Sequence, residues 1–248
     1  YLNPTNACTC RCVYCQVREH KRGTAPVIDL VRLESELRMF LHEIQHGSFM
    51  QTQVPLAARR INDIALSGNG EPTSAREFEH VIELIGRVRG DYDLPKDLKL
   101  VLITNGSLID RPGVQAGLRQ MAELDGEVWF KLDSVTRVGR QRINNTRMSL
   151  KRMRENLQLA ASLCPTWLQT CVFQTDGKPP SSTESGAYLK FIEELLREGV
   201  PLKGTLLYGL ARPSMQLEAP RLSKVSQVWM DAFYARIQAL GLTVKLNP

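Results

Sequence analysis

Short, largely apolar runs alternate with amphipathic helical patterns along almost the whole chain, and this alternation constrains the fold more than any other feature. The runs of strand length lie at 61–66, 98–103, 127–132, 166–174, 202–208 and 242–246. Between them, apolar residues three or four positions apart predict helices at 75–88, 112–122, 150–163, 186–197 and 223–240. A further helix is predicted to begin after Asp29, which can cap it, and to end at Gly47. This repetition predicts an α/β fold with a parallel sheet and right-handed crossovers, as a full or partial barrel or as a flat doubly wound sheet.

The chain is predicted to form one domain of ordinary globular composition. It has 248 residues, of which 43% are hydrophobic and 23% are charged, and this is not the composition of a disordered chain. No apolar run approaches the roughly 18–20 residues that span a bilayer, and the N-terminus lacks the apolar core of a secretory signal, so we expect a cytoplasmic protein with no membrane contact. The stretch 176–185 is a polar loop rather than a linker, so residues 1–248 are predicted to be a single domain. Because the sequence lacks an initiator Met and residues 1–4 look like the end of a strand, we expect it to begin inside that domain.

Most of the cysteines are crowded into one short segment near the N-terminus, at Cys8, Cys10, Cys12 and Cys15. Such crowding suits a metal better than a disulfide framework, because neighbouring cysteines cannot all pair within one tight loop. A zinc site through Cys12 and Cys15 would need a second pair of ligands, and no second Cys-x-x-Cys or His pair follows. The other interpretation is an iron–sulfur cluster on Cys8, Cys12 and Cys15, at the spacing Cys-x3-Cys-x2-Cys. Since such clusters usually take four thiolates, three would leave one iron open to a substrate or cosubstrate.

This triplet, with the aromatic Tyr14 directly before its last cysteine, resembles the motif of the radical S-adenosylmethionine (radical SAM) family. The resemblance implies a partial (β/α)6 barrel and a 4Fe-4S cluster held by Cys8, Cys12 and Cys15. It further implies that the amino and carboxylate groups of SAM bind the unique iron, and that the backbone around Tyr14 contacts adenine. Cys10 is extra to the pattern and is predicted to be a bystander in the loop.

The remaining cysteines, Cys164 and Cys171, are predicted to be buried thiols, because a second cluster would need at least one more ligand than they provide.

A second motif, Ser-Gly-Asn-Gly-Glu-Pro-Thr at 67–73, lies between a predicted strand and a predicted helix. Its glycines would let backbone carbonyls approach a ligand closely. It resembles the Gly-Gly-Glu-Pro motif that holds the amino group of SAM in the radical SAM family, with Asn69 in the place of the usual first glycine. The resemblance implies that Asn69, Gly70 and Glu71 bind this end of SAM. Taken alone, the segment is also compatible with an ordinary turn that has Pro72 near the helix start.

Further polar residues follow or interrupt the later strands, at the end of a parallel barrel where chemistry is usually placed. The resemblance implies ribose or methionyl contacts for the residues after the strands at 98–103 and 127–132. The polar residue within the apolar strand 166–174 indicates a lumen position near SAM or substrate, and the arginine after 202–208 can pair with a carboxylate of SAM or substrate or with a phosphate. These candidates for binding the cofactor or the substrate are Thr104, Asn105, Asp133, Ser134, Gln169 and Arg212. Lys131 alternates with Leu132, so one of these two side chains is predicted to face the barrel lumen.

The function implied by the resemblance is that of a radical SAM enzyme. A reduced 4Fe-4S cluster would cleave SAM to a 5′-deoxyadenosyl radical, which would abstract hydrogen from the substrate, with a flavodoxin or ferredoxin as reductant. The segments Asn-Gly-Glu-Pro-Thr and Lys-Leu-Asp look closest to the group that contains wyosine-type tRNA-modifying enzymes, and a net charge of +6 permits an anionic substrate. A tRNA base is therefore the favoured substrate, and a peptide or a small metabolite is the alternative. A non-catalytic iron–sulfur or zinc-binding electron-transfer module is the alternative from another class. No residue is assigned as catalytic.

Overall fold

A six-stranded parallel sheet forms the centre of the molecule. We describe it from a computed structural model, which places residues 7–18, 21–67, 69–95 and 97–247. The strand order is β10-β8-β6-β5-β4-β3, and every neighbouring pair is parallel. The strands are β3 (Asp63–Leu66), β4 (Lys99–Thr104), β5 (Glu127–Lys131), β6 (Thr166–Cys171), β8 (Leu202–Tyr208) and β10 (Val244–Asn247). The parallel sheet and the helices that connect its strands confirm the predicted α/β fold class.

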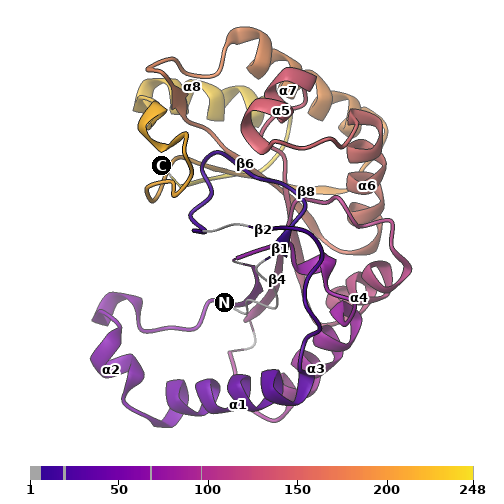
Figure 1. The fold of residues 1–248 in the computed structure, drawn as a ribbon, viewed down its shortest axis with the longest axis vertical. Helices are drawn as coiled ribbons and strands as arrows, with labels where there is room; N and C mark the ends of the chain where they lie inside the picture. The colour runs from indigo at the N-terminus through magenta and orange to yellow at the C-terminus, as the bar shows by residue number, and fades with distance from the viewer. Residues whose placement is uncertain (1–6, 19–20, 68, 96, 248) are drawn as a thin grey trace.

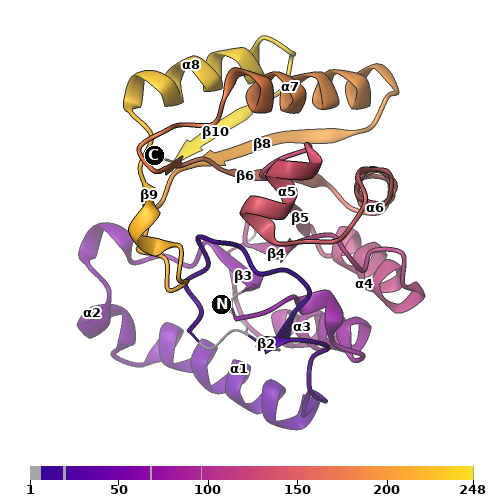
Figure 2. The ribbon, with the colours of Figure 1, turned by 45° about the horizontal axis from the view of Figure 1, so that its top comes forward.

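Helices connect the strands and cover the outer face of the sheet (Figure 1). They are α1 (Leu30–His46), α2 (Phe49–Gln53), α3 (Phe78–Gly90), α4 (Pro112–Glu123), α5 (Arg137–Asn144), α6 (Leu150–Leu163), α7 (Ser182–Arg197) and α8 (Gln227–Gln238). Short 3-10 turns lie at η1 (Leu56–Ala58), η2 (Pro72–Ser74) and η3 (Ala219–Arg221), and two-residue strands form the pairs β1 (Ala7–Cys8) with β2 (Lys21–Arg22) and β7 (Gln174–Thr175) with β9 (Leu222–Ser223). Figures 1 and 2 show that the helices follow one another around a crescent, with the cysteine-bearing segment on its inner side.

The sheet is a partial barrel rather than a closed one. The edge strands are β3 and β10, and they do not pair with each other in the described part of the chain. The prediction of a partial (β/α)6 barrel is thus confirmed, and the flat doubly wound alternative is excluded by the curvature seen in Figure 2. Because all six strands are parallel, their carboxyl ends meet at one rim, where the candidate residues are expected.

The core lies between the sheet and the helices. On neighbouring strands, Phe130, Leu168 and Leu207 are fully buried against the helix layer. The alternate positions face the inside of the crescent, because successive side chains of a strand point to opposite faces. Lys131 is paired with Gln169 in the sheet register, so these two polar side chains lie side by side on the inner face. The structure thereby settles that Lys131, and not the buried Leu132, faces the lumen.

Most predicted elements are found with shifted ends. Asp29 caps α1 by accepting a hydrogen bond from the backbone N–H of Arg32 at 3.0 Å, and Gly47 ends this helix, as predicted. The strand expected over 166–174 ends at Cys171, and the helix expected from 186 begins at Ser182, within the predicted polar loop. Helix α5 was not predicted, because its residues are mostly polar. Its N-terminus is capped by the side chain of Thr136.

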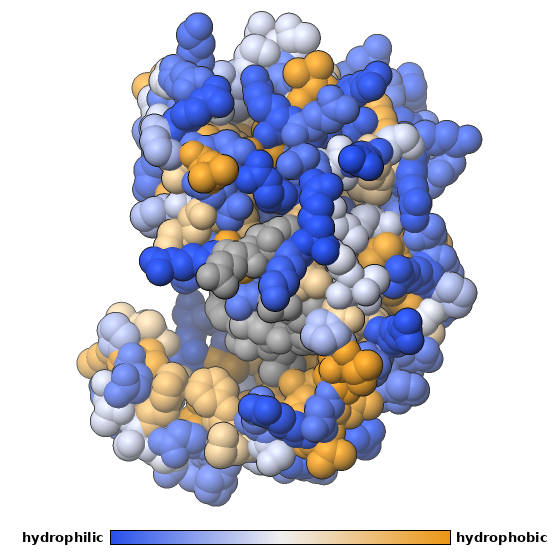
Figure 3. Space-filling view, viewed as in Figure 1, coloured by the Kyte–Doolittle hydropathy of each residue, from blue (hydrophilic) through white to orange (hydrophobic). Residues whose placement is uncertain are grey.

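Apolar side chains are scarce on the face shown in Figure 3 and gather mainly over the arm formed by α1 and α2. Exposed apolar residues of this arm and the following turn include Val31, Met39, Phe40 and Leu56. No helix in the described ranges is both long enough and apolar enough to cross a membrane.

Candidate functional site

The cysteine-bearing segment lies across the rim where the strands end. Its first anchor is the turn after β3, where the backbone N–H of Glu71 donates to the carbonyl of Ala7 at 2.8 Å. Its second anchor is the end of α5, where Arg11 and Val13 donate to the carbonyls of residues 144 and 143 at 3.0 and 2.8 Å. Backbone hydrogen bonds to two separate elements therefore hold the segment at the rim.

A third anchor comes from far along the sequence, from residues 214–218, which we call the clasp. The hydroxyl of Ser214 donates to the carbonyl of Val13 at 2.7 Å. The side-chain amide of Gln216 donates to the carbonyls of Cys15 and Val17 at 3.2 and 2.9 Å. The clasp thus takes up carbonyl groups of the cysteine segment that would otherwise lack a partner in a partly buried loop.

An ion pair closes the same contact. The guanidinium of Arg11 lies 2.6 Å from a carboxylate oxygen of Glu218, and both side chains are only partly exposed. The clasp and the cysteine segment are therefore joined by charge as well as by backbone hydrogen bonds.

The three cysteines of the triplet are half-buried, whereas Cys10 is buried. Burial, together with the nearby carboxylate of Glu71, raises the pKa of Cys8 to about 12. Burial also raises the pKa of Cys10 and of Cys12, and the positive charge of Lys131 opposes this shift at Cys12. Without a metal, these thiols are protonated near neutral pH.

Amide groups already contact the sulfur atoms of two triplet cysteines. The side-chain nitrogen of Asn105 lies 3.5 Å from Sγ of Cys8, and that of Asn144 lies 3.3 Å from Sγ of Cys12. Hydrogen bonds to sulfur favour the thiolate over the thiol. Asn105 follows β4 and Asn144 ends α5, so two separate elements support the triplet.

The donor set fits an iron–sulfur cluster. Within the residues that the structure places, no three His, Cys, Asp or Glu side chains stand together as a ready set of metal ligands. Cysteine ligands lose their protons when they bind a metal, so the raised pKa values of the thiols do not prevent ligation. Cys8, Cys12 and Cys15 lie on one short anchored segment, and amide donors face the first two of them. Both features suit thiolate ligands of a cluster.

Tyr14 connects the cysteine segment to the end of β5. Its hydroxyl donates to Asp133 at 2.5 Å, and its ring lies 5.6 Å from that of Phe173 and 5.0 Å from Nζ of Lys131. Burial opposes the charge of Lys131, but Tyr208 and Asp133 together raise the pKa of its ammonium well above the usual value. A half-buried cation therefore lies on the inner face beside the cysteine segment.

Asp133 connects the cysteine segment to several elements of the rim. Besides the hydroxyl of Tyr14, its carboxylate accepts hydrogen bonds from the side chain of Asn144 at 2.6 Å and from the backbone N–H of Cys171 at 2.9 Å. It therefore ties together the ends of β5, β6 and α5. These contacts position neighbouring groups, and they leave little of the carboxylate free for a ribose.

Glu71 turns its carboxylate into the protein. It is 2% exposed and accepts hydrogen bonds from the hydroxyls of Thr73 and Thr104 at 2.7 and 2.5 Å and from the backbone N–H of Asn105 at 2.7 Å. Burial raises its pKa, and these hydrogen bonds oppose the shift. Its side chain joins the ends of β3 and β4, so a ligand here would meet the backbone of this turn and not the carboxylate.

The other residues predicted after β4 and β5 are also bonded within the protein. The hydroxyl of Thr104 donates to Glu71, as described, and that of Ser134 donates to Glu184 at 2.7 Å. The turn after β4 needs its glycine, because Gly106 has a φ of +71° and a Cβ there would lie 2.1 Å from the Phe130 ring. These contacts show that Thr104, Asn105 and Ser134 shape the rim.

The remaining predicted residues differ in their positions. Asn69 and Gly70 are in the turn between β3 and η2, and Asn69 is exposed. Gln169 is on the inner face of β6, and its Oε1 is buried without a hydrogen-bond partner among the described residues. Arg212 is exposed and lines none of the cavities described below, so the structure does not bring it together with the other candidates.

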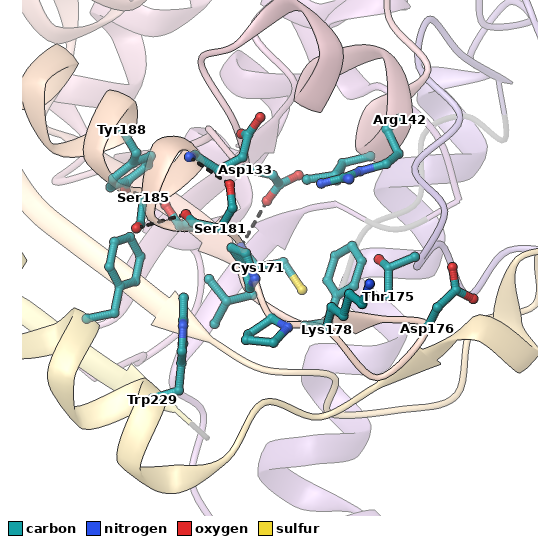
Figure 4. A pocket seen from close by; sticks show the side chains of 18 of the residues that line it. Asp133, Arg142, Cys171, Thr175, Asp176, Lys178, Ser181, Ser185, Tyr188 and Trp229 are labelled. Atoms are coloured by element: carbon teal, nitrogen blue, oxygen red, sulfur yellow. Dashed lines mark hydrogen bonds between the residues drawn. The ribbon is translucent and has the colours of Figure 1, made fainter.

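Two cavities adjoin this rim and share Asp133 in their walls. A small one of about 20 Å³ is lined by Cys10, Cys12, Asn105 and Lys131, among others. A larger one of about 400 Å³ lies between the end of β6, the loop that follows it and the helices α5, α7 and α8 (Figure 4). None of the triplet cysteines lines the larger cavity.

Comparison with known proteins identifies the family. The sequence profile of the Radical SAM superfamily matches residues 2–178. The chain belongs to the radical SAM superfamily. The resemblance seen in the cysteine triplet is thereby confirmed at the level of the family, and the superfamily implies SAM and an iron–sulfur cluster as cofactors.

Curated relatives are distant. A UPF0026 protein of Helicobacter pylori is 24% identical over 247 residues, which cover 99% of this chain and 70% of the relative. A UPF0026 protein of Synechocystis sp. is 27% identical over 143 residues, which cover 58% of this chain and 45% of the relative. The chain thus spans less than half the length of the Synechocystis protein.

Solved radical SAM structures share the fold. SuiB of Streptococcus suis bound to S-adenosylmethionine superposes with a TM-score of 0.64 at 10% identity, over 99% of this chain and 48% of SuiB. A radical SAM methyltransferase of Sphaerobacter thermophilus gives 0.65 at 13% identity, over 99% and 64% of the two chains. TYW1 with a lysine-pyruvate adduct bound gives 0.58 at 15% identity, over 96% and 71%. These neighbours show that the chain has the fold of radical SAM enzymes.

Several site residues were missed by the sequence analysis. They are Asn144, the clasp and the Arg11–Glu218 ion pair. For Asn144 the sequence does contain a signal, since two successive asparagines are typical of a helix end, and the structure ends α5 there with Asn145 at a left-handed φ of 47°. The contacts of the clasp join residues about two hundred positions apart and leave no local pattern.

Proposed function

We propose that this chain is an enzyme that holds a 4Fe-4S cluster on Cys8, Cys12 and Cys15 and binds SAM beside it at the rim of the barrel. When bound, the reduced cluster and SAM together supply a radical that abstracts hydrogen from an unreactive carbon of the substrate. The observation that carries this proposal is the anchored cysteine segment, on which amide donors contact the sulfur atoms of Cys8 and Cys12 at 3.5 and 3.3 Å.

The residues around the segment have distinct proposed tasks. Asn105 and Asn144 stabilise the thiolate forms of two ligands by hydrogen bonds. The backbone of Asn69 and Gly70 receives the amino end of SAM, while the buried carboxylate of Glu71 keeps this turn in place. Tyr14 holds its part of the segment against Asp133, and its backbone is the proposed contact for adenine.

Lys131 and Gln169 share the inner face beneath this region. The Lys131 ammonium lies over the Tyr14 ring, and Gln169 is its neighbour in the sheet register. A ligand that enters from the rim would meet a cation and an unpaired amide oxygen there. Thr104 and Ser134 support this wall through Glu71 and Glu184. Arg212, which is exposed, is proposed to meet only a ligand large enough to extend beyond the rim.

For the substrate, we favour a tRNA base. The net charge of +6 supports an anionic partner, and the likeness of the segments 69–73 and 131–133 to wyosine-type tRNA-modifying enzymes supports RNA. The reductant is proposed to be a flavodoxin or a ferredoxin, and the compartment the cytoplasm.

Anaerobic reconstitution tests this function. The protein is incubated with iron, sulfide, SAM and dithionite, and 5′-deoxyadenosine is measured. We expect 5′-deoxyadenosine from the wild type and none from Cys12→Ala, which is matched in fold but lacks one ligand. Retention of tRNA that weakens steeply with salt would support the nucleic-acid substrate, and a wild type that binds iron yet forms no 5′-deoxyadenosine would favour an electron-transfer module.

A further inference from the structure

We propose that the cavity of about 400 Å³ between β6, α7 and α8 is the binding site for a nucleotide, that is, for a planar base with an attached phosphate. This inference rests on the proposed function, in which the radical acts on a separate substrate. The cavity has the size of a small-molecule site, and Figure 4 shows Arg142, Lys178 and Asp176 on one side of it and Trp229 on the other.

Aromatic rings form the floor of the cavity. Phe233 lies 5.6 Å from Tyr188 and 5.1 Å from Trp229, measured between ring centroids, and Phe173 lies on the side toward the cysteine segment. The hydroxyl of Tyr188 is bonded to Thr170 at 2.6 Å, so this side chain offers no free polar group to a ligand. Such a floor suits a planar base, because stacking of a base on an aromatic side chain contributes about 1–3 kcal/mol.

The cations and carboxylates of the cavity wall differ in how they are bonded. The wall contains three of each, so it has no net formal charge. All three carboxylates are held by contacts within the protein: Asp133 by Tyr14, Glu184 by Ser134, and Asp176 by Arg221 at 2.6 Å. In contrast, Arg142 and Lys178 are exposed and form no ion pair within the described ranges. In Figure 4, the Arg142 side chain reaches toward the same side of the cavity as Lys178 and Thr175. These two cations are free to hold a phosphate, and the guanidinium of Arg142 can do so with two parallel hydrogen bonds.

The position of the cavity fits a substrate better than the methionine end of SAM. Its wall contains Asp133 and Cys171, and Asp133 contacts Tyr14 of the cysteine segment directly. A bound nucleotide would therefore lie next to the cluster region. The methionine end of SAM must reach the triplet cysteines, and none of them lines this cavity, whereas Cys12 lines the small cavity on which Asp133 also borders. The larger cavity is thus left for a second ligand.

Binding measurements on the reconstituted protein test this proposal. The probes are the four nucleoside 5′-monophosphates and unmodified tRNA, titrated without reductant while fluorescence is followed. We expect stacking on Trp229 to quench its emission and the Trp229→Leu variant to lose this signal. The double variant Arg142→Ala/Lys178→Ala should raise the Kd of the ligand at least tenfold and reduce its dependence on salt. The matched control is Arg137→Ala, which removes an exposed arginine from the first turn of the same helix α5, outside the cavity, and should leave the Kd unchanged.

The outcomes separate the possible sources of the nucleotide. An effect of the double variant on mononucleotides and tRNA alike supports a site for free nucleotides, and an effect on tRNA alone supports a nucleotide held within RNA. The proposal is overturned if neither Kd changes in the double variant, or if the Kd of SAM rises together with that of the nucleotide, because the cavity would then belong to the cofactor. Since no reductant is present, binding is measured independently of SAM cleavage. A wild type that binds nucleotides but forms no 5′-deoxyadenosine would refute the proposed function and leave the site in place.

Discussion

Replacement of Glu71 tests the idea that its buried carboxylate braces the rim of the barrel. In Glu71→Ala, the hydroxyls of Thr73 and Thr104 and the backbone N–H groups of Thr73 and Asn105 lose their acceptor. A buried donor without a partner costs about 1–3 kcal/mol. The hydroxyls can rotate toward other acceptors, but the two backbone N–H groups cannot. We therefore expect the free energy of unfolding to fall by about 3 kcal/mol, most of it from these two N–H groups.

Glu71→Gln is the matched variant. Its amide oxygen can still accept from the backbone N–H of Asn105, and its NH2 group can face the two hydroxyls, which are able to accept as well as donate. We expect a loss of about 1 kcal/mol. Chemical denaturation of the iron-free protein, followed by circular dichroism, measures both variants. If Glu71→Gln were as unstable as Glu71→Ala, or if Glu71→Ala lost less than about 1 kcal/mol, the bracing role would be refuted.

The same pair of proteins gives a pH dependence with a defined sign. Burial raises the pKa of Glu71 above its ordinary value of 4.5. The folded protein therefore keeps this proton at pH values where the unfolded chain has released it, and the contribution of Glu71 to stability decreases as the pH rises above 4.5. As the pH rises above 4.5, the free energy of unfolding of the wild type should fall relative to that of Glu71→Gln, since glutamine does not titrate. A difference that stayed flat or rose with pH would contradict the assigned shift.

Three further predictions concern the cysteine segment. Cys10→Ala should keep the visible absorbance of the cluster and Cys12→Ala should lose it, so loss of iron from Cys10→Ala would mean that the ligand set is wrong. Glu218→Ala removes the ion pair with Arg11, and partly exposed pairs of this kind contribute about 1 kcal/mol or less to stability. We therefore expect little change in melting temperature but faster loss of iron to a chelator. An unchanged rate of iron loss would show that the clasp does not hold the segment. Asn144→Leu removes the donor to Sγ of Cys12 and should lower the reduction potential of the cluster without SAM, and an unchanged potential would mean that this hydrogen bond is absent in the loaded protein.

Much of the fold could be predicted from the sequence because its strands are apolar and its helices are amphipathic. The runs at 202–208 and 150–163 match β8 and α6 residue for residue. Helix α5 could not be predicted because Arg137–Asn144 has almost no apolar face. The helix is held by the hydrogen bond of its cap Thr136 and by neighbours distant in sequence. Whether the sheet curls depends on strand register and twist, which hydrophobic periodicity does not encode.

For the site, the spacing of the cysteines could be interpreted from the sequence, but the directions of the side chains could not. The cysteine spacing and Tyr14 identify the family from a few residues, since ligands of one cluster must be close in sequence or held by the fold. The sequence could not show that Glu71 turns inward, because this depends on donors at Thr104 and Asn105, which come from the next strand. The same limit applies to Arg212, which was predicted to bind an anion from its place after β8 but lies exposed and apart from the other candidates.

Electron paramagnetic resonance of the reduced, reconstituted protein shows whether SAM binds to the one iron that lacks a cysteine ligand. Spectra are recorded before and after the addition of SAM for the wild type and for Cys10→Ala. We expect the signal of a reduced 4Fe-4S cluster whose g-values shift when SAM is added, in both proteins. A cluster signal that SAM leaves unchanged, or a protein that takes up zinc and no iron, would contradict this expectation.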